Sequence, residues 1–162
     1  MDRDNFLDRV LEFLKASGVR YCVIGGTGVN AYAYPVVTED LNIVVSAGEI
    51  DALEAALRKE FKVRRFEHSI NVSTTGSKLQ LQIQTDPRYF DFVDRAEVLE
   101  VMDFHLPVAD IGDILKGKIW AAMDTTRRKS KRQKDLADIA RIIEVSPELR
   151  NEVPDELLSK LI

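Results

Sequence analysis

The stretch that decides the fold is YCVIGGTGVNAYAYPVVTEDLNIVV, residues 21 to 45. An apolar run leads into the glycine pair Gly25 and Gly26, and a second apolar run, DLNIVV, follows a short connection that contains Pro35. Short apolar runs bounded by glycine and proline are typical of buried strands. We therefore expect strands near 20–24 and 40–45, adjacent in one sheet and joined by a short crossover with one or two helical turns.

The segments on either side of this stretch show two different periods. Apolar residues recur at helical spacing over 4–16 and again over 47–61, which predicts an amphipathic helix at each place. From residue 62 the period changes to two, and we expect strands within 62–67, 70–75 and 78–86. The last of these should lie beside the 40–45 strand, with Leu81 and Ile83 on its core face and Gln82 on its polar face.

The C-terminal part reads as a strand pair followed by helices. The pair is expected within 97–109, after a helix or turn at 87–96, and the helices at 110–123 and 134–145. These elements predict an α+β fold with an α/β-like start, in which a mixed β-sheet is followed by C-terminal helices. We expect one domain over 1–162, with a sheet-containing core over 1–108 and a helical extension over 109–162.

Composition sets outer bounds on function. The chain has 162 residues, 45% of them hydrophobic, and a formal net charge of -4, which argues against a generally basic nucleic-acid coat protein. A single cysteine, Cys22, excludes an intramolecular disulfide and is expected to be a buried thiol. No signal-peptide pattern and no apolar run of membrane length is visible, so we expect a cytoplasmic protein without membrane contact.

The glycine pair is the first candidate for chemistry. Glycines between a buried strand and a helix allow the backbone to approach a phosphate, and the unpaired N–H groups at a helix start attract anions. Thr27 would add a hydroxyl donor. The alternative is an ordinary turn with no ligand, which such a pair forms equally well.

Asp40 and Asn42 are the second candidate. Residues two apart on a strand point to the same face, and a carboxylate pair at that spacing can hold divalent metals against a triphosphate. Here the second position is an amide, so one negative charge is missing.

The chain resembles the minimal bacterial and archaeal nucleotidyltransferases of the polymerase-beta-like superfamily, which include toxins of the abortive-infection type. The resemblance rests on residues 21–45, similar to the family's strand, glycine turn, short helix and Asp-x-Asp strand. It also rests on LPVADIGDILKGKIWAAM and RQKDLADIARII, which look like the family's late helix pair. It implies transfer of a nucleoside monophosphate from an NTP to an acceptor, with Mg²⁺ ions held by three carboxylates.

The resemblance also assigns roles to individual residues. It implies catalytic and metal-binding positions at Asp40 and Asn42, and a third carboxylate position at Gln82. It implies nucleotide binding by Gly25, Gly26, Lys118 and Asp135, to which the hydroxyl of Thr27 would be added from the chemistry of the turn. Two of the three metal-ligand positions are therefore amides in this chain.

This departure predicts that Mg²⁺ and NTP bind weakly and that transfer is weakened or lost, because an amide oxygen brings no negative charge to the metal. Glu39 points to the opposite strand face, and Asp86 lies roughly 13 Å beyond Gln82 along a strand, so neither restores the site. Two classes of function stay open. One is an active Mg²⁺-dependent nucleotidyltransferase using Asp40 in a rearranged site, and the other is a non-catalytic module that binds a nucleotide, RNA or protein partner.

A basic stretch, RRKSKRQK at 127–134, stands out in an acidic chain. We expect it to be a loop between helices, in which Arg127, Arg128, Lys131 and Arg132 contact phosphate or RNA, or alternatively are simply solvated. Asp135 and Asp138 follow at helical spacing. They would belong to the nucleotide site or cap the start of the helix, where negative charge is favourable.

Overall fold

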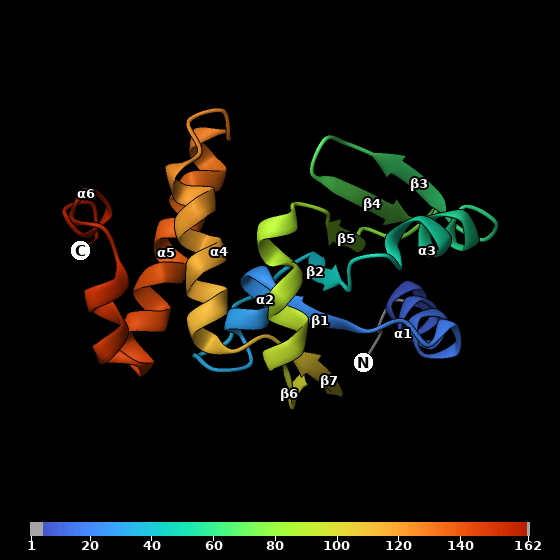
Figure 1. The fold of residues 1–162 in the computed structure, drawn as a ribbon, viewed down its shortest axis with the longest axis horizontal. Helices are drawn as coiled ribbons and strands as arrows, with labels where there is room; N and C mark the ends of the chain where they lie inside the picture. The colour runs from blue at the N-terminus through green and yellow to red at the C-terminus, as the bar shows by residue number, and fades with distance from the viewer. Residues whose placement is uncertain (1–4, 162) are drawn as a thin grey trace.

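A computed structural model describes residues 5–161 of the chain (Figure 1). Its first half contains α1 (Asn5–Ser17), β1 (Tyr21–Ile24), α2 (Gly25–Val29), β2 (Asp40–Val45), α3 (Ile50–Leu57), β3 (Lys62–Arg65), β4 (Ser69–Ser73) and β5 (Gln80–Gln84). Its second half contains the 3₁₀ segment η1 (Pro87–Arg95), β6 (Glu97–Val101), β7 (Phe104–Val108), α4 (Ile111–Met123), α5 (Lys129–Val145), η2 (Pro147–Glu152) and α6 (Asp155–Leu158). Each predicted strand is present, with slightly shifted ends.

The seven strands form one mixed sheet in the order β3-β4-β5-β2-β1-β7-β6. The predicted adjacency is confirmed, because β2 pairs with β1 on one side and with β5 on the other. The pair β1 and β2 is antiparallel, whereas β2 and β5 are parallel. A crossover would make β1 and β2 parallel, whereas their antiparallel pairing means that the chain turns back through the connection that contains α2. The expected crossover is therefore wrong, and the chain start is not a parallel βαβ unit.

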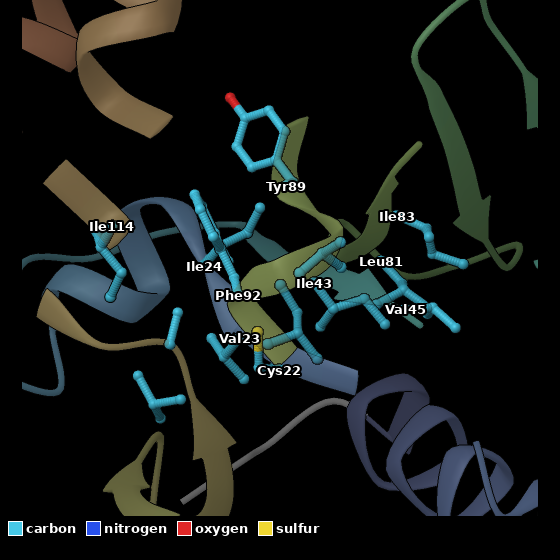
Figure 2. Close-up of a cluster of buried hydrophobic side chains, with 14 of the residues drawn as sticks. Cys22, Val23, Ile24, Ile43, Val45, Leu81, Ile83, Tyr89, Phe92 and Ile114 are labelled. Carbon is cyan, nitrogen blue, oxygen red and sulfur yellow. The ribbon is translucent and has the colours of Figure 1, made fainter. Parts of the chain in front are cut away.

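The two faces of the central strands differ as their alternation predicts. On β5, Leu81 and Ile83 are buried, whereas the glutamines between them are more exposed. The buried residues join Ile43 and Val45 of β2 in the apolar cluster shown in Figure 2. Cys22 lies in the same cluster, fully buried, and burial raises the pKa of its thiol to about 12. The prediction of a buried thiol is confirmed.

The helices flank the sheet in two groups (Figure 1). At one end of the view, α4 and α5 stand side by side, and α1 and α3 lie at the other end. The segment η1 packs against β1 and β2, and α2 contacts both α4 and α5. This arrangement places the end of β1, the start of α2 and the facing side of α4 next to one another. No helix within residues 5–161 is both long and apolar enough to cross a membrane.

The basic stretch is mostly helical, which corrects the predicted loop. Helix α5 begins at Lys129 and not at residue 134, so only the first two residues of the stretch precede it. The physical reason is that lysine, arginine and glutamine all have high helix propensity, and their density of charge does not prevent a helix. Asp135 lies well inside α5, so its interpretation as a cap of the helix start is also wrong.

Candidate functional site

The turn after β1 is built on close contact between Gly25 and Asn42. Gly25 has φ +67°, a left-handed conformation that favours glycine. A Cβ atom at this position would lie 3.0 Å from both Cβ and Cγ of Asn42 and closer still to its amide nitrogen. The second glycine, Gly26, lies beside the carboxylate of Asp138. Gly25 therefore allows β2 to approach the start of α2 closely, whereas a Cβ at Gly26 would make only ordinary contact with Asp138.

Thr27 connects α2 to β2. Its side chain is 0% exposed, and its hydroxyl donates to the backbone oxygen of Asp40 at 3.1 Å. The same oxygen atom of Thr27 accepts from the backbone N–H of Asn42 at 3.4 Å. The hydroxyl is thus buried, and its single O–H is engaged with the backbone of β2 in this structure. Its place is structural, because it holds the strand that carries the Asp-x-Asn pattern.

The three positions that the resemblance assigned to metal ligands lie on neighbouring strands and on one face of the sheet. Asn42 of β2 is directly opposite Gln82 of β5 in the parallel register. Asp40 is opposite Gln80, two residues earlier on the same two strands and therefore on the same face. Asn71 on β4 extends this row of polar side chains by one strand, since it is the register partner of Gln82. This part of the sheet therefore presents one carboxylate among several amides.

A cavity of about 110 Å³ opens between this sheet face and helix α4. It brings together six of the residues predicted for the site, namely Gly25, Asn42, Gln82, Lys118, Arg127 and Asp135. The other predicted residues are not among its lining residues, namely Gly26, Thr27, Asp40, Arg128, Lys131 and Arg132. The cavity thus combines the amide row with a charged cluster from α4 and α5.

The charged cluster is centred on Asp135. Its side chain is 0% exposed, and it accepts from Lys118 Nζ at 3.1 Å and from Arg127 Nε at 2.7 Å. Lys118 also contacts Asp138 at 2.9 Å. Buried ion pairs of this kind hold their side chains in fixed positions, because an unpaired buried charge is costly. The lysine that the resemblance assigned to the nucleotide is therefore held at the cavity by two carboxylates.

A brace beside this cluster was not predicted from the sequence. Arg141 donates to Asp138 at 2.9 Å, to the side-chain oxygen of Asn30 at 3.0 Å and to the backbone oxygen of Tyr34 at 2.8 Å. Asn30 in turn exchanges hydrogen bonds with the backbone of Val36. The connection between α2 and β2 is thereby fixed to α5. The available signal was weak, namely that Arg141 follows Asp138 by three residues on one helix face.

Aromatic side chains close the cavity on the side of η1. Tyr89 and Phe92 both line it, and Tyr89 packs edge-on against Trp120 with ring centroids 5.1 Å apart. Figure 2 shows Tyr89 with its hydroxyl pointing away from the buried cluster. That hydroxyl donates to the backbone oxygen of Gly117 at 3.3 Å, and burial raises its pKa to about 12. Tyr89 is therefore a neutral donor at neutral pH. Its place at the cavity had no signal in the sequence.

The four predicted phosphate contacts of the basic stretch separate into two kinds. Arg127 is paired with Asp135, and Arg132 donates to the backbone oxygen of Ala122 at 3.0 Å. Within the described part of the chain, Arg128 and Lys131 have no ion-pair partner, and Arg128 is exposed. Two of the four residues therefore stabilise the helix pair, and the other two are available to a partner.

The residues present fit a pair of divalent metal ions poorly. Among residues 5–161, no three His, Cys, Asp or Glu side chains come close enough together to hold a metal ion. The row of Asp40, Asn42 and Gln82 offers one carboxylate, and Mg²⁺ gives up its water molecules reluctantly without strong anionic ligands.

Comparison with known proteins identifies the family. The sequence profile of a family described as nucleotidyl transferase AbiEii toxin, type IV TA system, matches residues 21–162. The chain belongs to the AbiEii family. No curated protein matches the sequence. The recognition of a nucleotidyltransferase of the abortive-infection toxin type is therefore confirmed.

Solved structures confirm the nucleotidyltransferase fold of this AbiEii family member. The antibiotic-resistance factor ANT(2'')-Ia has a TM-score of 0.60 at 9% identity, with 91% of each chain covered. The lincosamide antibiotic adenylyltransferase LnuA has a TM-score of 0.54 at 13% identity, covering 86% of this chain and 98% of its own. The putative nucleotidyltransferase TM1012 from Thermotoga maritima has a TM-score of 0.51 at 15% identity, covering 74% and 86%. At such identities the likeness concerns the fold.

Proposed function

We propose that this AbiEii family member binds a nucleotide at the cavity between β2, β5 and α4, and that its transfer of a nucleoside monophosphate is weakened or lost. The observation that carries the proposal is the pairing of Asn42 with Gln82 on adjacent parallel strands. These are the two positions at which the family resemblance implies carboxylates. With amides at both, Asp40 is the remaining acidic side chain of the row.

Electrostatics supports this conclusion. Phosphoryl transfer depends on positioning and on neutralising the charge that develops on the phosphates, and metal ions held by carboxylates supply most of that neutralisation. Replacing two of three carboxylates by amides removes two negative charges that would hold those ions. Cationic side chains that can bind the phosphates of a nucleotide remain, because Lys118 and Arg127 line the cavity. The chain thus keeps nucleotide binding, while its metal-dependent transfer is weakened or lost.

A transfer assay tests the proposal. The full chain is incubated with radiolabelled NTP, Mg²⁺ and a pool of RNA acceptors, and both pyrophosphate release and labelled acceptor are measured. We expect slow or absent transfer by the natural sequence, and detectable transfer after the joint substitution Asn42→Asp and Gln82→Asp. Rapid Mg²⁺-dependent transfer by the natural chain, abolished by Asp40→Ala, would establish the active alternative and refute the proposal.

A second candidate function is RNA contact by the start of α5. Arg128, Lys129, Lys131 and Lys134 are cations without an ion-pair partner within residues 5–161. The three lysines lie on α5, which also carries Asp135 at the cavity, and Arg128 immediately precedes this helix. Phosphate contacts of this kind are independent of sequence and weaken with salt. An RNA held there would be an acceptor if transfer persists, and a binding partner if it does not.

A further inference from the structure

On the sheet wall of the cavity, two side-chain amides have their oxygen ends buried or already hydrogen-bonded. Asn42 Oδ1 is buried and has no hydrogen-bond partner, whereas Nδ2 of the same amide lies over Gly25. Gln84 Oε1 accepts from the backbone N–H of Asp86 at 3.0 Å, so its oxygen is also engaged. Since the two ends of a planar amide point in different directions, the NH₂ groups of Asn42 and Gln84 are the ends left for the cavity.

The opposite wall adds cationic donors. Lys118 carries three N–H donors, of which Asp135 and Asp138 take two. Arg127 carries five, and Asp135 takes two of them, at 2.7 Å and 3.3 Å. The carboxylate of Asp135 thus accepts three hydrogen bonds from these two cations, while each cation keeps free N–H groups. Donors therefore outnumber free acceptors around the cavity.

We propose that this cavity binds a phosphate group directly, through amide and cationic N–H donors, without a divalent metal ion. The inference rests on the proposed function, because it requires that Asn42 and Gln82 do not serve as metal ligands. In a carboxylate-lined site, phosphate and carboxylate oxygens repel one another unless a cation lies between them. Amides at the same positions remove that repulsion and donate hydrogen bonds, which are strengthened when the acceptor is an anion.

The size of the cavity agrees with such a ligand. Its volume of about 110 Å³ accommodates several water molecules, and hence a phosphate group with its oxygens. Tyr89 and Phe92 add aromatic walls on the η1 side. The chemical class of ligand is therefore a phosphate monoester or a pyrophosphate, with inorganic pyrophosphate as its simplest probe.

Nuclear magnetic resonance tests this directly on the full chain. Inorganic pyrophosphate is titrated into ¹⁵N-labelled protein in EDTA, and the side-chain NH₂ signals are followed. We expect the signals of Asn42, Gln82 and Gln84 to move, while that of Asn151 on η2 stays in place. Signals that stay in place in EDTA, or that move only with Mg²⁺, would overturn the proposal.

Variants connect the binding to these amides. Gln82→Glu and Asn42→Asp should each weaken pyrophosphate binding in EDTA by about tenfold or more, because a carboxylate repels the anion. Gln80→Glu is the matched control, since it adds the same charge on the same strand and face but at an exposed residue outside the cavity lining. Its effect should stay below about threefold.

Circular dichroism establishes whether each variant is folded. If Gln82→Glu is not folded, the comparison of Asn42→Asp with the natural chain decides the outcome. Equal weakening by Gln80→Glu and Gln82→Glu would overturn the assignment to the cavity.

The two proposals fail separately. Metal-free pyrophosphate binding together with rapid transfer that depends on Asp40 and Mg²⁺ would overturn the proposed loss of catalysis and leave this inference standing. Absence of metal-free binding together with absence of transfer would overturn this inference alone.

Discussion

The side chain of Asn42 occupies the space that a side chain at residue 25 would need. A Cβ atom at Gly25 would lie 3.0 Å from Asn42 Cβ and Cγ and nearer to its amide nitrogen, and Gly25 also has φ +67°. An aspartate is the same size as an asparagine, so the close packing by itself does not exclude a carboxylate here. Asparagine and aspartate would therefore fit equally well at position 42. The amide differs from a carboxylate only in its chemistry, and it removes one negative charge from the site.

Gly25→Ala should therefore lower the free energy of unfolding by more than the strain of the left-handed backbone alone would. The left-handed conformation costs about 1–2 kcal/mol for a residue with a Cβ, and overpacking against Asn42 adds about 1–3 kcal/mol. Gly48→Ala is the control, because Gly48 has φ +90° with open space around it. Urea denaturation measures both variants. Adding Asn42→Ala to Gly25→Ala should recover the overpacking part, and a failure to recover stability would contradict the contact.

Restoring both carboxylates should restore metal binding. The double variant Asn42→Asp and Gln82→Asp places two charges at register-paired positions near Asp40, and calorimetry should show Mg²⁺ affinity raised by about tenfold or more. Each single change should raise it by less than about threefold, because one added carboxylate still leaves an amide in the row. A single variant that binds Mg²⁺ as tightly as the double would show that the row does not act as one site.

The ion pairs around Asp135 should be cooperative. Lys118→Met or Arg127→Met alone leaves the other cation in place and should cost about 1–2 kcal/mol of unfolding free energy. The double substitution leaves a buried carboxylate unpaired and should cost about 3–5 kcal/mol. Guanidinium denaturation of all three variants measures the coupling. Arg128→Met, at an exposed neighbouring position, is the control and should change stability by no more than about 0.5 kcal/mol.

RNA binding, if α5 provides it, should depend on its free cations. Arg128→Gln with Lys131→Gln should reduce the slope of log affinity against log salt for a single-stranded RNA by about 1.4, or about 0.7 for each lost phosphate contact. Fluorescence anisotropy over a range of salt concentrations gives the slope. Arg127 and Arg132 are left intact because they hold Asp135 and the end of α4. An unchanged slope would mean that these cations are simply solvated.

Cys22 should be unreactive in the native state. Burial raises its pKa to about 12 from an ordinary value of 9.0, so the neutral thiol predominates at all pH values below about 12 while the chain is folded. Because the folded pKa is raised, the thiol favours folding most below pH 9 and loses this contribution as the pH rises towards 12. Labelling by a disulfide reagent at pH 8 should therefore follow unfolding, and urea should accelerate it. An exposed Ala16→Cys variant should label at once, and equally fast labelling of Cys22 in the native chain would contradict its burial.

The sequence by itself determined the elements that carry the site. Strand alternation has a period of exactly two, so the placement of Gln82 on the polar face and Leu81 on the core face could be predicted without tertiary information. Asp40 and Asn42 share a face for the same reason. The glycine pair, the polar strand faces and the late helices were identified because their signals are local. The charge density of the basic stretch predicts a loop, whereas the helix propensity of its lysine, arginine and glutamine residues makes most of it helical.

Only the tertiary structure decided which of these residues meet. The contact of Arg141 with Asn30 depends on how α5 docks beside α2, and that of Thr27 with the backbone of β2 depends on how α2 packs on the sheet. The contact of Arg127 with Asp135 depends on the turn that leads into α5. The direction of each amide at the cavity depends on what the other end of that amide meets, as the buried oxygen of Asn42 shows. Such choices are set by packing and hydrogen bonding between distant parts of the chain, for which local sequence patterns carry no signal.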